Sequence, residues 1–475
     1  MSSREPDRSA SRAIVTTPDG APFPTVGHAT TVTRRSWVLT DDDKLARRRY
    51  IASHGRSRPA HALRNDALAP KAAVEVLGRV GWNAFSLNKV ASHMDLAKTA
   101  LHNRYSSRAD LARDVWADRL LPSLTASLER ALTAALGQPS VDPNAQGSPR
   151  SDDAPGHSRA EFQEAMRTFA YPDDVTTAAI ELLLASISEP ELASGVRDTM
   201  DEWLRGQYSS LLSERPTDEA RVRDTRLSAV LLWAFGLTVF ANRPWLPDMD
   251  LTSALDRAYD ALQASGDVRE LPADRAAYLT ETPFFTDDPR VDEVLERAFL
   301  SFGTIGYSRT RLRDLAQATG VSESFIIQRF KTKLGLIRAI VETTYAQSYE
   351  AFSAFQATVS EAHGPGIAEA VAWREYLDPS IRDRQLLGVE TDRLVLFDPT
   401  MSRLAIPDEL VIVERRLAAI PVAERALRLG DTHLDFAAGH GLPIVGLLVP
   451  GAHALPWNLV TDPMIASDHF LTGAG

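Results

Sequence analysis

The chain has 475 residues, of which 44% are hydrophobic and 24% charged, with no cysteine and a formal net charge of -11. This length suggests about two to four globular domains, and the lack of cysteine excludes disulfides and thiolate metal sites. Residues 1–20 hold no apolar run of signal-peptide type, and the apolar stretch at 227–242 is shorter than the roughly 20 residues that a membrane span needs, so we expect a cytoplasmic protein without a membrane segment.

Positive charge is concentrated in three segments of this acidic chain. Residues 1–63 carry a net charge of +5, residues 64–116 carry +3, and residues 289–341 carry +4, which leaves -23 for the rest. Such polarity is typical of a protein that turns one face toward a polyanion, although solvated charged helix faces would give the same pattern.

The chain begins with a segment that is rich in Pro, Thr, Ser and Arg. We predict that residues 1–62 form a disordered basic tail. Most of its charge lies in residues 44–64, which either reach into a DNA minor groove or form a solvated tail.

Two segments further along the chain repeat each other. Residues 73–116 align without a gap with residues 298–341, at an offset of 225. We call them the first and second repeat copies, and we place them in two domains, 63–117 and 289–342. The residues that recur are Ala73, Gly78, Gly81, Leu87, Ala91, Arg104, Leu111 and Arg113, as Ala298, Gly303, Gly306, Leu312, Ala316, Arg329, Leu336 and Arg338.

Each copy has the pattern of a helix-turn-helix between two supporting helices. An apolar stripe predicts the first helix, which Gly81 or Gly306 ends, because glycine tolerates the backbone conformation of a helix terminus. In the second copy, Gly320 turns the chain and Ser322 caps the third helix. That helix is expected to bury Ile326 and Phe330 and to expose 323, 324, 327 and 328. A fourth helix starts near Thr332 and buries Leu336, Ile337 and Ile340.

Both copies resemble the N-terminal DNA-binding domain of TetR-family (tetracycline-repressor-like) transcriptional regulators. The second copy supplies "GYSRTRLRDLAQATGVSESFIIQRFKTKLGL" and the first "GWNAFSLNKVASHMDLAKTALHNRYSSRADL". The resemblance implies that outward residues of the third helix contact bases and phosphates, and that the basic residue at the start of the fourth helix contacts a phosphate. The positions so implied are Ser86, Lys98, Thr99, His102, Asn103, Arg104 and Arg108, and Arg311, Ser324, Gln328, Arg329 and Lys333.

The copies depart from the family pattern at different places. The usual Tyr of the third helix is His102 in the first copy and Ile327 in the second, and Phe325 replaces a small or hydroxyl residue. Asp95 stands in place of the turn glycine, which Asp tolerates because it visits the left-handed region. We therefore expect the first copy to bind DNA more strongly.

A helical stretch follows each copy, at 118–275 and 343–475, and residues 276–288 form the linker. Residues 137–158, rich in Pro, Gly, Ser and Asp, predict a disordered loop. The fold class is all-α, with two TetR-like units, and the apolar helices near 227–242 and 434–450 are expected to pair. Aromatic residues of these stretches are either plain core or the lining of effector pockets: Trp203, Tyr208, Trp233, Phe235, Trp373, Tyr376 and Phe397.

The sequence contains no pattern of catalytic residues, and we expect no enzyme activity, no cofactor and no metal. The interpretation is a cytoplasmic transcriptional regulator that binds double-stranded DNA, a repressor released by a small apolar effector. Two tandem units would make it a monomeric pseudo-dimer rather than a homodimer. The alternative is a helical protein–protein interaction or scaffold protein with degenerate helix-turn-helix domains.

Overall fold

The structure is a computed structural model that describes residues 60–97, 99–137, 158–241, 250–264, 271–273, 284, 286–398, 401, 418, 421–449 and 451–458. These residues form helices, turns and short connections, with no strand among them, so the all-α fold class is confirmed. The expected tail up to residue 59, the interior of the expected loop, most of the expected linker and Lys98 lie outside the described residues.

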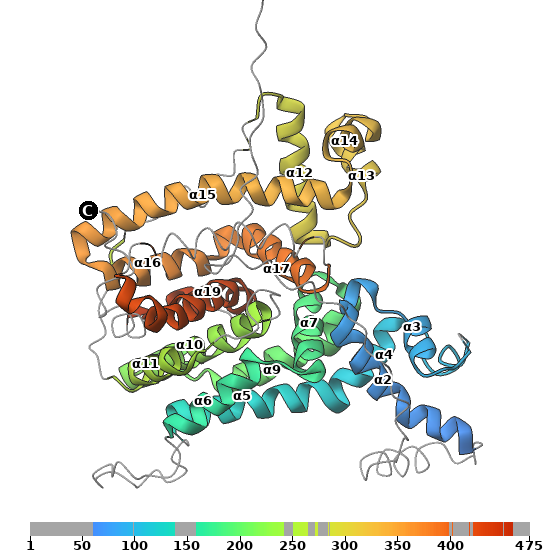
Figure 1. The fold of residues 1–475 in the computed structure, drawn as a ribbon, viewed down its shortest axis with the longest axis horizontal. Helices are drawn as coiled ribbons and strands as arrows, with labels where there is room; N and C mark the ends of the chain where they lie inside the picture. Colours follow the sequence, from blue (N-terminus) through green and yellow to red (C-terminus); the bar gives the residue numbers. More distant parts are fainter. Residues whose placement is uncertain are drawn as a thin grey trace, which may run out of the picture. The chain divides into compact units, whose positions relative to one another are not determined.

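The helices before residue 264 form the first part of the described chain (Figure 1). They are α2 (Ala60–Ala84), α3 (Leu87–His93), α4 (Arg108–Val115), η1 (Trp116–Leu120), α5 (Leu121–Leu136), α6 (Arg159–Ala170), α7 (Asp174–Ser188), α8 (Pro190–Leu192), η2 (Ala193–Arg197), α9 (Asp198–Gln207), η3 (Ser210–Leu212), α10 (Asp218–Ala241) and α11 (Thr252–Gln263). Helix α2 begins at Ala60, shortly before the expected domain start at 63.

The helices after residue 288 follow a similar order. They are α12 (Pro289–Ile305), α13 (Leu312–Thr319), α14 (Glu323–Phe330), α15 (Lys333–His363), α16 (Pro365–Leu377), η5 (Pro379–Ile381), α17 (Arg382–Phe397), η6 (Val422–Glu424), α19 (Arg425–Leu448) and η7 (Ala452–Ala454). The expected domain boundaries at 117/118 and 342/343 fall inside η1 and α15, so in each half a helix leads directly from the repeat copy into the helices that follow.

Corresponding helices in the two halves make corresponding contacts. Helix α2 packs against α7, as α12 packs against α17, and α5 packs against α6, as α15 packs against α16. Glycines allow α2 to approach α7 closely, and α12 to approach α17 closely. A Cβ atom at Gly78 would lie 2.6 Å from the backbone oxygen of Asp174, and one at Gly303 would lie 3.1 Å from that of Asp383.

Helices α10 and α19 form the most extensive helix–helix contact of the described residues and lie side by side in Figure 1. The expected pairing of the two apolar helices is thus confirmed. A Cβ atom at Gly236 would lie 1.6 Å from the Ala437 oxygen, and one at Gly441 would lie 2.1 Å from the Leu232 oxygen. The two backbones can therefore cross at this distance only because both residues lack a side chain.

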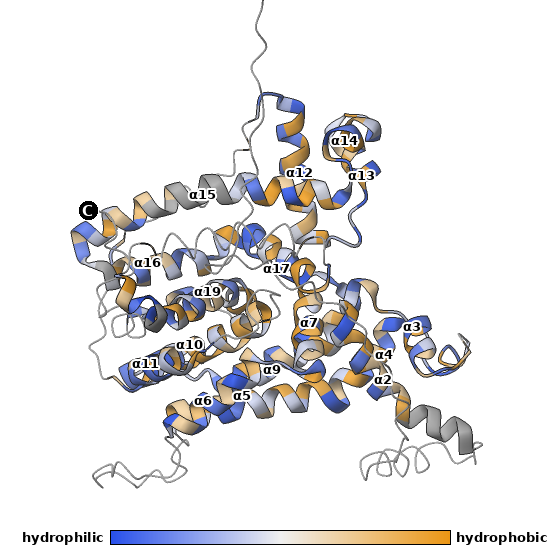
Figure 2. Ribbon diagram, in the orientation of Figure 1, coloured by the Kyte–Doolittle hydropathy of each residue, from blue (hydrophilic) through white to orange (hydrophobic). Residues whose placement is uncertain are grey.

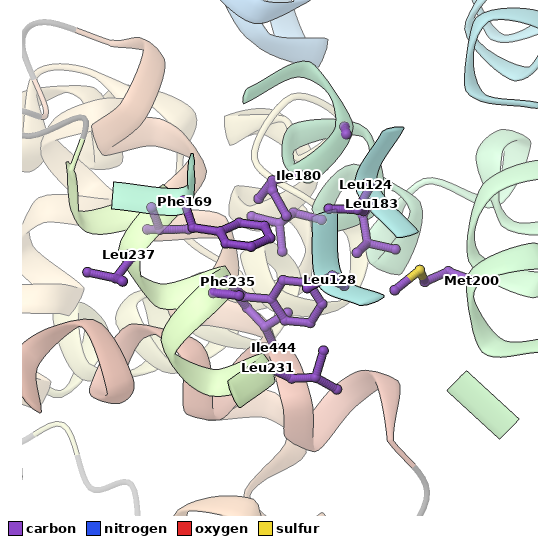
Figure 3. Close-up of a cluster of buried hydrophobic side chains, with 14 of the residues drawn as sticks. Leu124, Leu128, Phe169, Ile180, Leu183, Met200, Leu231, Phe235, Leu237 and Ile444 are labelled. Carbon is purple, nitrogen blue, oxygen red and sulfur yellow. The ribbon is translucent and has the colours of Figure 1, made fainter. Parts of the chain in front are cut away.

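The core is continuous through the helices of the first half and includes α19. Helix α7 is hydrophobic along most of its length (Figure 2) and is buried from Thr176 to Ser186. Figure 3 shows Phe169, Ile180, Phe235 and Ile444 of four different helices in one buried cluster. Helix α10 is long and apolar enough to cross a membrane by length and composition, but 89% of its apolar window is buried inside the protein, so it is the core helix that the sequence predicted.

Candidate nucleic-acid interface

The second repeat copy folds as its sequence predicts. Gly306 (φ 89°) ends α12, and Gly320 (φ 69°) ends α13 in the left-handed conformation. The hydroxyl of Ser322 accepts the Phe325 N–H at 3.1 Å and caps α14. Helix α15 starts after Thr332, whose hydroxyl accepts the Gly335 N–H at 2.9 Å. The residues predicted to be buried in the third and fourth helices are buried: Ile326, Phe330, Leu336, Ile337 and Ile340. Leu315 and Ala316 of α13 are buried as well.

The first repeat copy repeats this backbone as far as its second helix. Gly81 has a φ of 65°, like the corresponding Gly306. Asp95 has a φ of 55° at the position of Gly320, so the prediction that Asp takes over the glycine turn is confirmed. Ser86 caps α3 by accepting the Lys89 N–H at 3.3 Å.

The two copies then diverge in the segments that correspond to the recognition helix of TetR-type domains. We call residues 322–330 the second recognition segment and residues 97–105 the first. The second is helix α14, whereas residues 99–104 of the first form turns. The backbone N–H groups of Ala100 and Arg104 bond to carbonyls three residues before them, and Tyr105 bonds to Leu101 at 2.9 Å. The expected helix is therefore wrong for the described part of the first segment.

Local sequence explains this difference. The capping Ser322 corresponds to Ala97, which has no side-chain acceptor for a backbone N–H at the helix start. Glu323 corresponds to Lys98, and a positive charge in the first turn opposes the helix dipole, whereas a carboxylate favours it. Thr99, His102 and Asn103 are weak helix formers. The first segment thus lacks the signals that start and sustain a short helix.

The residues predicted to contact DNA lie mostly at the surface. On the second copy, Ser324, Gln328 and Arg329 lie exposed on α14, together with Glu323 and Ile327, which matches the predicted outward face. Arg311 is exposed at the start of α13. On the first copy, Thr99, His102 and Asn103 are exposed in the turns, and Arg104 is partly buried and donates to Asp114 at 3.3 Å. Lys98 lies outside the described residues, and Ser86 is the cap of α3.

Two hydrophobic residues on α14 have different surroundings. Phe325 packs against the core of the second copy, and the Arg290 guanidinium lies 4.8 Å from the centre of its ring. Ile327 is 44% exposed and lies on the same outward face as Gln328. Phe325 therefore stabilises α14, and Ile327 is the apolar residue available to a partner on this face.

Arg108 and Lys333, the basic residues at the starts of α4 and α15, fold back onto their own copies. Arg108 donates to the Trp82 carbonyl at 3.0 Å, and its guanidinium lies 4.1 Å from the Trp82 ring centre. Lys333 donates to the Tyr307 carbonyl at 2.5 Å, and its ammonium lies 4.2 Å from the Tyr307 ring centre. Burial lowers the pKa of Lys333, against an opposing effect of Glu390. Both side chains thus hold the end of the first helix, and their contact with phosphate stays a prediction.

The same two aromatic residues connect each copy to the helical core. The backbone N–H of Trp82 donates to Glu181 Oε1 of α7 at 2.7 Å, and the backbone N–H of Tyr307 donates to Glu390 Oε1 of α17 at 2.6 Å. Both glutamates are buried. The sequence analysis missed these two glutamates. They lie in corresponding helices after each copy, so an alignment continued past the copies with an offset shorter than 225 would have paired them.

A polar hollow lies beside these junctions. It is lined by Arg108, Glu189, Pro190, Glu191 and Arg309. Arg108 approaches Glu191 at 3.6 Å, and Arg309 approaches Glu189 at 3.4 Å. Burial raises the pKa of Glu189, against the opposing effect of Arg309 and two further arginines. Both repeat copies therefore make charged contacts with the corner between α7 and α8.

The aromatic residues predicted for effector pockets are largely core. Tyr208, Trp233, Phe235 and Trp373 are buried in the main cluster, and Trp203 and Tyr376 pack against it. Phe397 lies against Gly81, where its ring would be 2.6 Å from an added Cβ. The indole N–H of Trp233 is buried and has no hydrogen-bond partner among the residues that the structure describes. None of the seven lines the hollow beside Glu189, and their role toward an effector stays a prediction.

Comparison with known proteins agrees with the geometry of the second copy. Residues 294–340 match the family model of bacterial regulatory proteins of the tetR family. The chain carries a TetR-type helix-turn-helix domain. The match covers α13 and α14, so this part of the chain is similar to the DNA-binding domain of that family. Among proteins of curated function, none matches the chain.

Proposed function

We propose that the chain is a cytoplasmic TetR-family repressor that binds double-stranded DNA mainly through α14 of the second repeat copy. The observation that carries this proposal is the capped helix α14 with Ser324, Gln328 and Arg329 on its exposed face, within the segment that matches the family. These side chains suit base edges and phosphates, since amide groups pair with adenine and guanidinium groups with guanine or phosphate.

We further propose that the two repeat copies act as an intramolecular pseudo-dimer. The pairing of α10 with α19 and the corresponding junctions at Glu181 and Glu390 support this arrangement. The two recognition segments differ in sequence and in local structure, so the preferred DNA site is asymmetric. The first copy contributes phosphate contacts and α14 contributes most base contacts.

The effector that would release the DNA is a small apolar molecule held among the helices that follow each copy. Because η1 and α15 lead from the repeat copies directly into those helices, a ligand that moves them changes the positions of the recognition segments. An otherwise apolar ligand that carries one hydrogen-bond acceptor could satisfy the buried indole N–H of Trp233.

The proposal is tested by selecting bound sequences from random duplex DNA and measuring affinity for the selected site at several salt concentrations. We expect a selected site that is asymmetric, and affinity that falls steeply with salt, because phosphate contacts release counterions. Failure to enrich any sequence, with no salt-dependent binding, would overturn it.

A second candidate is a protein–protein interaction role, favoured by exposed Ile327 on α14 and by the turns of the first recognition segment. Ile327→Ser separates the two candidates. We expect it to leave DNA binding in place under the first proposal and to abolish partner binding under the second.

A further inference from the structure

Arg393 of α17 is a fully buried cation between two buried carboxylates. Its guanidinium donates to Glu181 through Nε and Nη2, both at 3.0 Å, and to Glu390 through Nη1 at 2.7 Å. The side chains of the three residues are 1–3% exposed. Burial alone would lower the pKa of Arg393, but Glu181 and Glu390 raise it above its ordinary value. The group is therefore charged and is held by two carboxylates at once.

Each of these carboxylates also holds one repeat copy. Glu181 Oε1 accepts the N–H of Trp82, directly after Gly81 of the first copy. Glu390 Oε1 accepts the N–H of Tyr307, directly after Gly306 of the second copy. A continuous chain of hydrogen bonds thus runs from the end of the first helix of one copy, through Arg393, to the end of the first helix of the other.

The arrangement is asymmetric in one respect. Glu181 and Glu390 occupy corresponding places in α7 and α17, but the residue that corresponds to Arg393 is Leu184 of α7. One arginine therefore serves both copies. Glycine packing adds to the link across the halves, because Gly81 lies against Phe397 of α17 and Gly306 lies near Ser188 and Glu189 at the end of α7.

The geometry points to Arg393 as a positioning residue that fixes the separation of the two repeat copies and hence the spacing of the DNA site. A guanidinium has several donors in a planar fork, which lets it hold two carboxylates with defined geometry. Because the three side chains are buried, an open form would leave charges unpaired in the core, so the network resists partial opening. The role in site spacing rests on the proposed function, and the fixed separation itself does not.

The separation can be measured directly, because the chain has no cysteine. Ser92→Cys and Gln317→Cys place spin labels at exposed, corresponding positions of α3 and α13. Pulsed electron–electron double resonance then gives the distribution of distances between the two spin labels, and hence between the copies, in the absence of DNA. We expect one narrow distribution in the otherwise unchanged protein, and a broad one would overturn the inference.

The decisive variant removes all three charges together, as Glu181→Gln, Arg393→Leu and Glu390→Gln. The glutamine amide oxygens can still accept the N–H groups of Trp82 and Tyr307, and leucine is the residue found at the corresponding position 184. Replacing a buried ionic group as a whole is often tolerated, so the fold is expected to persist, and the width of the distance distribution is expected to grow about twofold because only packing then sets the separation. An unchanged width and mean would overturn the inference.

Arg393→Lys answers the same question if the triple variant does not fold. A lysine ammonium lacks the planar fork, so we expect a distribution broader than that of the unchanged protein, and an unchanged one would contradict us. The matched control is Arg257→Leu, which removes a different cross-half ion pair, that of α11 with Asp431 of α19, and should leave the distribution narrow. DNA affinity is measured separately, so a protein that binds no DNA but shows these distances refutes the proposed function and not the fixed separation.

Discussion

Residues 73–116 and residues 298–341 agree at the surfaces that meet the helical core and differ at the surface that faces outward. Trp82 and Tyr307 make the same three contacts: an N–H to a buried glutamate, a carbonyl to a basic side chain, and a ring beneath that cation. By contrast, α14 is a capped helix and residues 99–104 are turns.

The comparison shows which interactions determine the structure of the junction with the core and which determine that of the exposed face. At the junction, buried donors need acceptors and closely packed backbones need glycine, so the two copies satisfy the same requirements with similar residues. At the exposed face, a short helix depends on its cap and on its first-turn charge, and the exchange of Ser for Ala and of Glu for Lys is enough to remove that support. Because only the second copy forms the capped third helix, our proposal places the main DNA contact there and replaces the expectation from the sequence that the first copy binds DNA more strongly.

The largest effect is expected where the two halves meet. Gly441→Ala places a methyl group against the Leu232 backbone oxygen of α10. We expect a loss of about 3 kcal/mol in the free energy of unfolding, the upper part of the range for overpacking. In the same helix, the new methyl group of Gly439→Ala has no described atom within 4 Å, so this variant should be as stable as the unchanged protein or slightly more stable. Urea denaturation of both variants checks this, and equal stability would show that α10 and α19 are not tightly paired.

A smaller effect is expected at the glycines that end the first helices. Alanine at a positive φ is strained in either copy, at a cost of about 1–3 kcal/mol. Gly81→Ala should lower the free energy of unfolding more than Gly306→Ala does. The methyl group added at position 81 would lie 2.6 Å from the Phe397 ring, whereas the one added at position 306 would lie 3.4 Å from its nearest neighbour, the Ser188 hydroxyl. Thermal unfolding of the two variants gives the difference, and the reverse order would mean that the junctions do not pack as described.

The smallest expected effect concerns the helix cap that distinguishes the copies. Ser322→Ala should destabilise the second copy by about 1 kcal/mol, and Ala97→Ser should stabilise the first by about 0.5 kcal/mol, because the hydroxyl can accept a backbone N–H at the helix start. Amide hydrogen exchange at residues 99–104 and 324–330 would register both changes. If Ala97→Ser gives no added protection, something other than the missing cap keeps the first segment from forming a helix.

The sequence was most informative where residue type and local backbone depend on each other. Gly81, Asp95, Gly306 and Gly320 were predicted to turn the chain, and all four have a positive φ. The helices of the second copy followed from apolar periodicity, and the pairing of α10 with α19 followed from the presence of one strongly apolar helix in each of the two units.

Other features could not be predicted because they depend on long-range contacts or on weak local preferences. The alignment predicted a third helix in the first copy, since it compared residue types and not capping at Ala97. The hydrogen-bond link through Arg393 joins residues more than 200 positions apart. Arg393 is also one of three arginines in α17, and nothing in the sequence distinguishes it from the other two. The aromatic residues were ambiguous from sequence, and most of them proved to be core.

The central claim, that α14 reads DNA and the first recognition segment contributes less, is tested most directly by two matched substitutions. Gln328 and Asn103 occupy corresponding, exposed positions of the two copies. On the selected DNA site, we expect Gln328→Ala to weaken binding by about 1–3 kcal/mol, the value of one base contact, and Asn103→Ala to change it by less than about 0.5 kcal/mol, as for a surface substitution. Fluorescence anisotropy titrations give both values. A larger loss for Asn103→Ala than for Gln328→Ala would contradict the account.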